Sequence, residues 1–143
     1  MKHKGAGIVY TDGKKVLLIK RSSKARDYPF TWASAGGNIE EGEGLKQAAE
    51  RESREEIGTV KGRKIAEFIN VPFAMFIYKV DKPFVVKLNE EHTESKWVDL
   101  DSVGSYKLHP NFRKEWPNYL KAINKNNKSF SEWILNLPLA SIL

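Results

Sequence analysis

The stretch from Gly36 to Gly58, GGNIEEGEGLKQAAERESREEIG, constrains the fold of this chain more than any other. At about 100° per residue, a helix that begins at Leu45 places its small and apolar side chains in one sector together with two carboxylates. That sector contains Leu45, Ala48, Ala49, Glu52 and Glu56, with Glu55 at its edge. The opposite arc, expected to be solvated, contains Lys46, Gln47, Glu50, Arg51 and Arg54. Gly58 is a natural left-handed cap, so we predict a helix from Leu45 to Glu56 with acidic groups on its apolar face.

The carboxylates of Glu52, Glu55 and Glu56 stand at i, i+3 and i+4, where they repel one another unless a cation lies among them. Magnesium prefers oxygen ligands from one or two carboxylates, waters and substrate phosphates, which is the set that this helix offers. The Gly36-Gly37 pair predicts a turn whose backbone can approach a metal or a phosphate closely. The alternative is a solvated acidic face, stabilised by ordinary i,i+4 ion pairs with the helix arginines.

Seven positions of this stretch match a known motif in register, and the stretch resembles the Nudix box. The matching residues are Gly37, Glu43, Arg51, Glu52, Glu55, Glu56 and Gly58. Ser53 and Thr59 stand where the family usually has larger apolar residues, and Ala35 replaces a proline that often precedes the glycine pair. These departures change the expected local packing and leave the chemical groups intact.

The resemblance implies an α/β fold, namely an α/β/α sandwich with a mixed β-sheet, formed by residues 1–143 as a single domain. It places the acidic helix on one side of the sheet and the C-terminal helices, residues 111–143, on the other. It also implies hydrolysis of the diphosphate linkage of a nucleoside diphosphate joined to another group. Mg²⁺ would be the cofactor and Mn²⁺ its substitute.

The resemblance further implies roles for single residues. Glu55 and Glu56 are expected to bind the metal, and Glu52 to bind it or to act as general base. Gly36 is expected to offer its carbonyl oxygen as a ligand, and Arg51 to orient a neighbouring carboxylate.

A second acidic cluster, NEEHTE at residues 89–94, precedes a Trp-Val pair. By the same resemblance, Glu91 is expected to supply one further carboxylate as metal ligand or base, with Glu90 and Glu94 as alternatives. A solvated acidic loop is the other interpretation. His92 is predicted to be a surface residue, because no second histidine or cysteine lies at ligand spacing.

The net charge of +6 comes entirely from the N-terminal quarter, where residues 1–36 hold eight Lys or Arg against two Asp. Such a basic end favours a polyanionic ligand, although a lysine-rich solvated surface is an equal alternative. Lys20, Arg21 and Arg26 are candidates for binding the outer phosphate of a substrate. Tyr28 lies in the following polar loop, whose cations and rings could hold phosphates and stack a base.

Three functional interpretations stay open. The first is a hydrolase of small dinucleotides or nucleotide sugars, such as ADP-ribose, diadenosine polyphosphates or FAD. The second is an enzyme that removes phosphates from RNA 5′ ends, and the third is a catalytically silent nucleotide-binding module. The complete motif argues against the third.

Composition is ordinary for one globular domain: 143 residues, of which 41% are hydrophobic and 29% charged. Because the sequence has no cysteine, disulfides, thiolate zinc sites and cysteine nucleophiles are excluded. No apolar run has the length of a membrane span, and the N-terminus lacks a signal-peptide core. We therefore expect a soluble cytoplasmic protein without a membrane partner.

Apolar, β-branched runs predict strands at residues 5–10, 14–20, 32–35, 64–71, 73–80, 84–88 and 96–99, the first two joined by an Asp-Gly hairpin. The tail predicts a helix over residues 111–123, kinked at Pro117, and a polar break at residues 124–128. A capping box of Ser129 and Glu132 then begins a last helix. The apolar end needs cover, which either a homodimer or docking on the same domain supplies.

Overall fold

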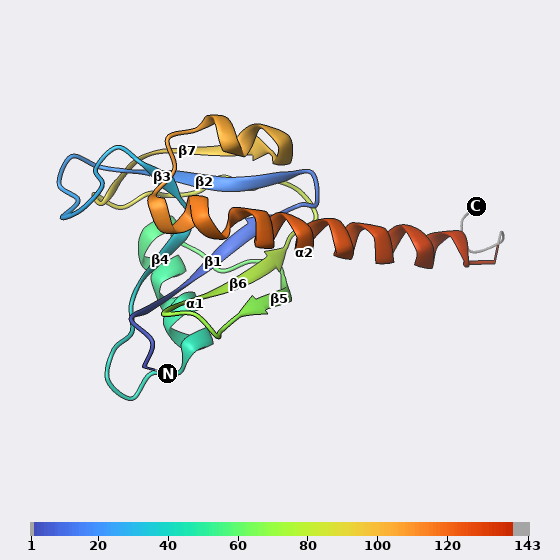
Figure 1. Cartoon of the computed structure of the whole chain (residues 1–143), viewed down its shortest axis with the longest axis horizontal. Helices are drawn as coiled ribbons and strands as arrows, with labels where there is room; N and C mark the ends of the chain where they lie inside the picture. The colour runs from blue at the N-terminus through green and yellow to red at the C-terminus, as the bar shows by residue number, and fades with distance from the viewer. Residues whose placement is uncertain (1, 139–143) are drawn as a thin grey trace.

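The computed structural model describes residues 2–138 of the chain. In chain order the elements are β1 (Gly5–Thr11), β2 (Lys15–Arg21), β3 (Trp32–Ala33), β4 (Ala35–Asn38), α1 (Leu45–Ile57), β5 (Arg63–Phe68), β6 (Phe73–Lys79), β7 (His92–Asp99), the 3-10 helix η1 (Leu100–Ser105) and α2 (Pro110–Leu135) (Figure 1). The acidic helix begins at the residue predicted from the sequence. It is capped by Gly58 with a left-handed φ of 84°.

The seven strands form one mixed sheet, in which β1 runs antiparallel to β4 and parallel to β6. β5 adds to β6, while β2 pairs with β3 and β7 and meets β1 through the predicted hairpin. The Asp12 side chain accepts hydrogen bonds from the amides of Lys14 and Lys15 at 2.9 and 2.8 Å. Gly13 has a φ of 97°, which glycine adopts without strain, so the Asp-Gly pair fixes the turn.

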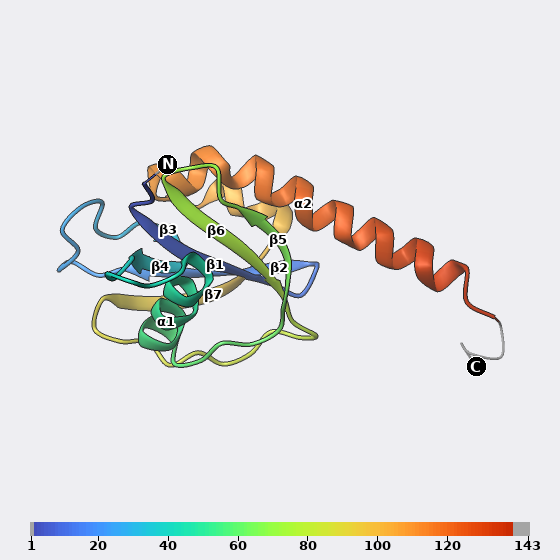
Figure 2. The ribbon, with the colours of Figure 1, turned by 90° about the horizontal axis from the view of Figure 1, so that it is seen from below.

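The side chains of β1 alternate between two cores, one on each face of the sheet. Ile8 and Tyr10 pack with the apolar side of α1, whereas Val9 packs with α2. The α2 residues of the second core are Phe112, Trp116, Tyr119 and Ile123. Figures 1 and 2 show α1 and α2 on opposite sides of the sheet, which confirms the predicted α/β/α sandwich.

The glycine pair Gly36-Gly37 lies in strand β4, so the turn predicted there is wrong. Gly36 pairs with Gly7 of β1, and a Cβ on Gly36 would lie 2.9 Å from the Ala6 carbonyl oxygen. Neither member of the pair has a positive φ. The glycines permit a close approach of strand to strand and of helix to strand rather than a left-handed conformation.

The strand predicted at residues 84–88 is also wrong, because residues 83–89 form no regular secondary structure. The Phe84 ring instead packs edge-on against the rings of Tyr10 and Trp97, with centroids 5.3 and 5.2 Å away. The Trp97 indole N–H donates to the Phe84 carbonyl oxygen at 2.9 Å. The apolar residues of this segment therefore reflect packing over the α1 face of the sheet and not strand pairing.

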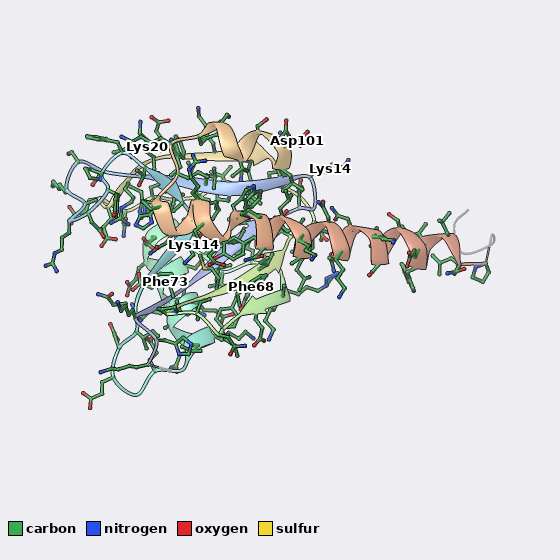
Figure 3. The ribbon with its side chains drawn as sticks, viewed as in Figure 1. Lys14, Lys20, Phe68, Phe73, Asp101 and Lys114 are labelled. Atoms are coloured by element: carbon green, nitrogen blue, oxygen red, sulfur yellow. The ribbon has the colours of Figure 1, made fainter. Side chains whose placement is uncertain are left out.

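The tail forms one continuous helix, so the break predicted at residues 124–128 and the capping box at Ser129 are wrong. The segment after Pro117 holds no glycine or proline before residue 138, and each asparagine costs a helix only about 0.7 kcal/mol relative to alanine. Asn127 also donates to the Gly13 carbonyl oxygen at 2.7 Å, which ties the helix to the β1–β2 hairpin. The distal end of α2 extends away from the body of the domain (Figure 3).

No helix within residues 2–138 combines the length and apolarity that crossing a bilayer requires. The end of the apolar LPLASIL stretch, residues 139–143, lies outside the described residues. What covers that end therefore stays a prediction.

Candidate active site

Glu56 lies on the inner face of α1, with only 3% of the residue exposed. Its Oε1 accepts a hydrogen bond from the Gly36 amide at 2.7 Å, which joins the C-terminal turn of the helix to β4. The prediction that an acidic group projects from the apolar face of this helix is confirmed for Glu56. Gly36 uses its N–H in this contact, and a role for its carbonyl oxygen as a metal ligand stays a prediction.

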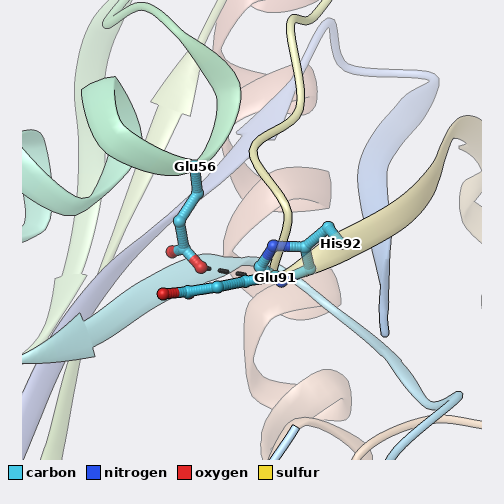
Figure 4. Close-up of side chains that lie close together, drawn as sticks. All are labelled: Glu56, Glu91 and His92. Carbon is cyan, nitrogen blue, oxygen red and sulfur yellow. Dashed lines mark ion pairs between the residues drawn. The ribbon is translucent and has the colours of Figure 1, made fainter. Parts of the chain in front are cut away.

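The segment before β7 folds against the same end of α1. The Asn89 amide donates to the Glu56 carbonyl oxygen at 3.3 Å, and the Asn89 side chain accepts from the Glu91 amide at 3.0 Å. These bonds bring Glu91 and His92 beside Glu56 (Figure 4). One potential ligand atom from each of the three side chains lies within 4.8 Å of the others. The second acidic cluster of the sequence thus meets the first in space.

Burial disfavours the charged forms of Glu56 and His92 and so shifts the pKa values of both residues. Burial raises the pKa of Glu56 to about 9, and the charges of Glu52 and Glu91 act in the same direction, although a backbone amide opposes them. Burial lowers the pKa of His92 to about 4, and the positive charge of Arg21 adds to this. Without a cation both groups are neutral at pH 7. The 3.5 Å contact from His92 Nε2 to Glu56 Oε2 is therefore not an ion pair under those conditions.

His92 is 8% exposed, so its prediction as a surface residue is wrong. Its Nδ1 is buried and has no hydrogen-bond partner among residues 2–138. No local sequence signal marked it, because its burial results from the Asn89 turn meeting a helix more than thirty residues earlier in the chain.

Arg51 holds the acidic side chains of α1 and of the preceding loop together. Its Nε and Nη2 donate to the two Glu43 oxygens at 2.7 and 3.0 Å, and its Nη1 donates to Glu52 at 3.0 Å and to Glu55 at 3.2 Å. Nη2 also donates to the Asn38 carbonyl oxygen at 2.8 Å. The guanidinium lowers the pKa of Glu43, and the same contacts raise the pKa of Arg51. Arg51 was predicted on the solvated arc, but it contacts three acidic side chains that the motif names.

Glu52 occupies space that the missing side chain of Gly37 leaves free. A Cβ on Gly37 would lie 2.5 Å from Glu52 Cδ and 2.6 Å from each carboxylate oxygen. Burial raises the pKa of Glu52, which the hydrogen bond from Arg51 opposes. Glu52 and Glu56 therefore both lie against the glycine strand β4.

Two other glutamates of α1 lie elsewhere. The Glu55 side chain is 53% exposed and contacts Arg51, outside the cluster of Glu56 with residues 91–92, so its role as a metal ligand stays a prediction. Glu50 was predicted on the solvated arc, which is wrong. It is half-buried and accepts a hydrogen bond from the Tyr78 hydroxyl at 2.7 Å, because α1 packs against β6 at this edge.

The departure at Ser53 is explained by a hydrogen-bond chain, whereas Thr59 contributes only its backbone and nothing in the structure explains its side chain. Ser53 is fully buried, and its hydroxyl donates to the Thr59 carbonyl oxygen at 2.6 Å. Since that bond uses its only proton, Ser53 accepts from the Tyr10 hydroxyl at 2.6 Å. The chain links β1 through Tyr10, α1 through Ser53 and the backbone of Thr59 just after the helix cap.

The predicted phosphate-binding residues are only partly brought together. Arg21 and Arg26 line a cleft of about 270 Å³ together with residues 90–92, beside the acidic cluster. Lys20 does not line this cleft. Its ammonium group lies 3.8 Å from the Glu94 carboxylate and above the Trp32 ring.

The loop after β2 holds two aromatic residues in an uncommon conformation. Tyr28 and Phe30 have φ angles of 47° and 63°, and they are 49% and 48% exposed. Bulky residues rarely adopt positive φ, so the surrounding contacts must impose it. Arg21 donates to the Asp27 carboxylate at 2.8 Å, and the Thr31 hydroxyl donates to the Tyr28 carbonyl oxygen at 2.7 Å. The loop is thus held by specific bonds, and base stacking by its rings, Tyr28 and Phe30, stays a prediction.

Comparison with known proteins agrees with this geometry. The model of the NUDIX domain family matches residues 1–120. The nucleoside triphosphatase NudI of Escherichia coli O139:H28 is 30% identical over 128 residues, which cover 75% of this chain and 88% of NudI. The m7GpppN-mRNA hydrolase NUDT17 of Xenopus laevis is 43% identical over 53 residues, which are 37% of this chain and only 18% of NUDT17.

Among solved structures, the Nudix hydrolase RenU from M. smegmatis superposes with a TM-score of 0.64 at 25% identity, over 96% of this chain and 89% of RenU. These matches identify a hydrolase that acts on phosphoanhydrides. The chain belongs to the Nudix family, and it is a pyrophosphohydrolase of that family.

Proposed function

We propose that this protein hydrolyses the diphosphate linkage of a nucleoside diphosphate joined to another group, using a divalent cation held at the end of α1. The observation that carries the proposal is the convergence of Glu56, Glu91 and His92 to within 4.8 Å. A bound cation would favour the charged form of the buried Glu56 carboxylate, whose pKa is raised, and the neutral imidazole of His92 offers a nitrogen lone pair beside it, because Nε2 lies 3.5 Å from Glu56 Oε2. The donor set therefore fits a metal, and its carboxylate oxygens favour Mg²⁺, with Mn²⁺ as substitute.

In this proposal, Glu56 and Glu91 would hold the metal, with Glu55 and the Gly36 carbonyl as further candidate ligands. Bound there, Mg²⁺ would neutralise the diphosphate and acidify a water molecule. Glu52 is fixed by its hydrogen bond from Arg51, so its carboxylate would accept the proton of the attacking water as general base.

The cleft beside the cluster would bind the substrate. Arg21 and Arg26 would contact the phosphate farther from the nucleoside, since both line the cleft. Lys20 lies farther off and would add only long-range attraction. Tyr28 and Phe30 would hold the nucleobase, because their rings are half-exposed and their backbone conformation is already fixed.

The proposed contacts fit a nucleotide with at least two phosphates. ADP-ribose, diadenosine polyphosphates and FAD are the first compounds to test. A nucleoside triphosphate is a second candidate, favoured by the similarity to NudI over most of both chains. RNA 5′ ends are a third, favoured by the shorter match to NUDT17. If the protein binds many phosphates of an extended RNA backbone, its affinity should fall steeply as the salt concentration rises. A small dinucleotide with few phosphates should give a shallow slope of log affinity against log salt concentration.

The experiment is a panel of these compounds and triphosphorylated RNA, assayed with Mg²⁺ and with excess chelator. For the best substrate, Glu52→Gln and Glu56→Gln should each lower kcat by roughly 10²-fold or more while the fold persists. The matched control is Glu41→Gln, an exposed glutamate in the loop before α1. Full turnover in chelator, or unchanged kcat in both site variants, would refute the proposal.

A further inference from the structure

A second concave surface, here called the basic groove, lies at the opposite end of the sheet from the acidic cluster. It encloses about 730 Å³, and its lining includes Lys61, Arg63, Lys79, Lys82, Phe84 and Phe130. Lys79 pairs with Thr11 at the end of β1, whereas the glycine strand meets β1 at Gly7. Four residues of extended strand separate these positions by about 13 Å. Figure 1 shows that β6 ends here, where α2 leaves the body of the domain.

The groove carries a concentrated positive charge. Its lining contains the four cations named above and a single carboxylate, that of Asp81. The ion pairs found among residues 2–138 leave all four cations without a carboxylate partner. Four cations against one carboxylate, with no ion pair among them, leave an excess of positive charge that is complementary to an anionic ligand.

Each wall of the groove presents an aromatic ring beside a cation. The Lys61 ammonium lies 5.4 Å from the centre of the Phe84 ring, and the Lys79 ammonium lies 5.6 Å from that of Phe130. Phe130 is 50% exposed, and Trp133 follows it on the same helix with 59% exposed. These rings offer apolar surface that the domain itself does not cover.

The walls are fixed to the body of the protein. Phe84 packs on Tyr10 through an edge-on contact of 5.3 Å. Asn127 ties α2 to the Gly13 carbonyl oxygen one turn before Phe130. The groove is therefore formed before any ligand binds, which lowers the entropic cost of binding.

We propose that the basic groove binds a single-stranded nucleic acid segment. Such a strand carries both phosphates and flat bases, and the groove presents both ammonium groups and aromatic rings, close to one another in two places. An acidic peptide would supply the charge without an aromatic group at each charged unit. A bilayer would need a convex or flat apolar face, whereas these residues line a concavity. The site is distinct from the acidic cluster and does not depend on which nucleotide that cluster hydrolyses.

The test measures fluorescence anisotropy of a labelled 15-nucleotide oligouridylate with a 5′-hydroxyl, which offers no phosphoanhydride to the acidic cluster. The groove variant is the triple Lys61→Ala, Lys79→Ala and Lys82→Ala. The matched control removes the same charge from three exposed lysines elsewhere, by Lys46→Ala, Lys107→Ala and Lys114→Ala.

The groove variant should bind at least 10-fold more weakly than the parent, and the slope of log affinity against log salt should fall by about 2. The control should bind within about 3-fold of the parent. Phe130→Ala should weaken binding by about 10-fold through lost base stacking. Turnover of the best small substrate should be unchanged in all three variants, which also shows that they fold.

Equal losses in the groove variant and the control would overturn the proposal, because binding would then reflect net charge alone. Absence of oligonucleotide binding by the parent at low salt would also overturn it. Two further results would count against the proposal. Tighter binding to phosphatidylserine vesicles than to the oligonucleotide would indicate a membrane surface as the occupant. A dimer in sedimentation that Phe130→Ala dissociates would indicate a second copy of the chain.

Discussion

Gly37 offers a substitution whose effects on activity and on stability should separate. In Gly37→Ala the added methyl carbon would lie 2.5 Å from Glu52 Cδ. Carbon atoms at rest lie about 3.5 to 4.0 Å apart, so the Glu52 carboxylate must move by roughly 1 Å. A displacement of that size in a catalytic group costs about 10²-fold in rate. Because the obstacle is the end of a flexible side chain, the free energy of unfolding should change by less than about 1 kcal/mol.

The contrasting variant is Gly7→Ala. Its methyl carbon would lie 2.4 Å from the Ala35 carbonyl oxygen, which belongs to the backbone of β4 and cannot rotate away. Overpacking of this kind costs about 1–3 kcal/mol, or a Tm lower by roughly 3–10 °C in a chain of this size. Gly104→Ala is the neutral control, because a Cβ there meets no atom within 4 Å.

The assays are thermal melts and steady-state kinetics with the best substrate at saturating Mg²⁺. Gly37→Ala should melt within about 3 °C of the parent and should lose kcat rather than raise KM. An unchanged kcat for Gly37→Ala would refute the placement of Glu52 as a working group. A melt as low as that of Gly7→Ala would refute the argument that the clash is confined to one side chain.

Three further predictions concern the metal, the buried carboxylate and the hydrogen-bond chain. Excess chelator should abolish turnover, and Mg²⁺ or Mn²⁺ should restore it better than Zn²⁺. In chelator the Tm of the parent should fall as pH rises from about 6.5 to about 9, because the unfolded chain releases the Glu56 proton at lower pH than the folded protein does, whereas below about 6.5 the opposite effect of the lowered His92 pKa offsets this fall. Glu56→Gln should lessen that fall whereas Glu41→Gln should keep it, and identical pH profiles would contradict the burial argument. Ser53→Ala should lower stability by about 1–3 kcal/mol, since it strands the Tyr10 hydroxyl and the Thr59 carbonyl oxygen. Adding Tyr10→Phe should then cost less than it does alone, and strictly additive losses in a double-mutant cycle would count against the chain.

Several features of this protein were determined by local sequence. The spacing of small residues and carboxylates predicted α1 to within one residue at its end and predicted the inward position of Glu56, because helical periodicity decides which side chains share a face. Asp12-Gly13 fixed the first hairpin through side-chain bonds to neighbouring amides. The seven motif positions were enough to predict the family and the sandwich.

Other features were decided only when distant segments met. Gly36-Gly37 became part of a strand because every residue of β4 finds a pairing partner in β1. The sequence did not decide this, because glycine is favoured both in a turn and in a strand whose backbone is approached closely. The helix α2 continued through its asparagines because one of them bonds to the hairpin. His92 became buried because a turn at Asn89 found the carbonyl oxygen of Glu56. Which carboxylates share a site is thus a property of the tertiary structure, since sequence patterns record the face of an element and not the segment that will cover it.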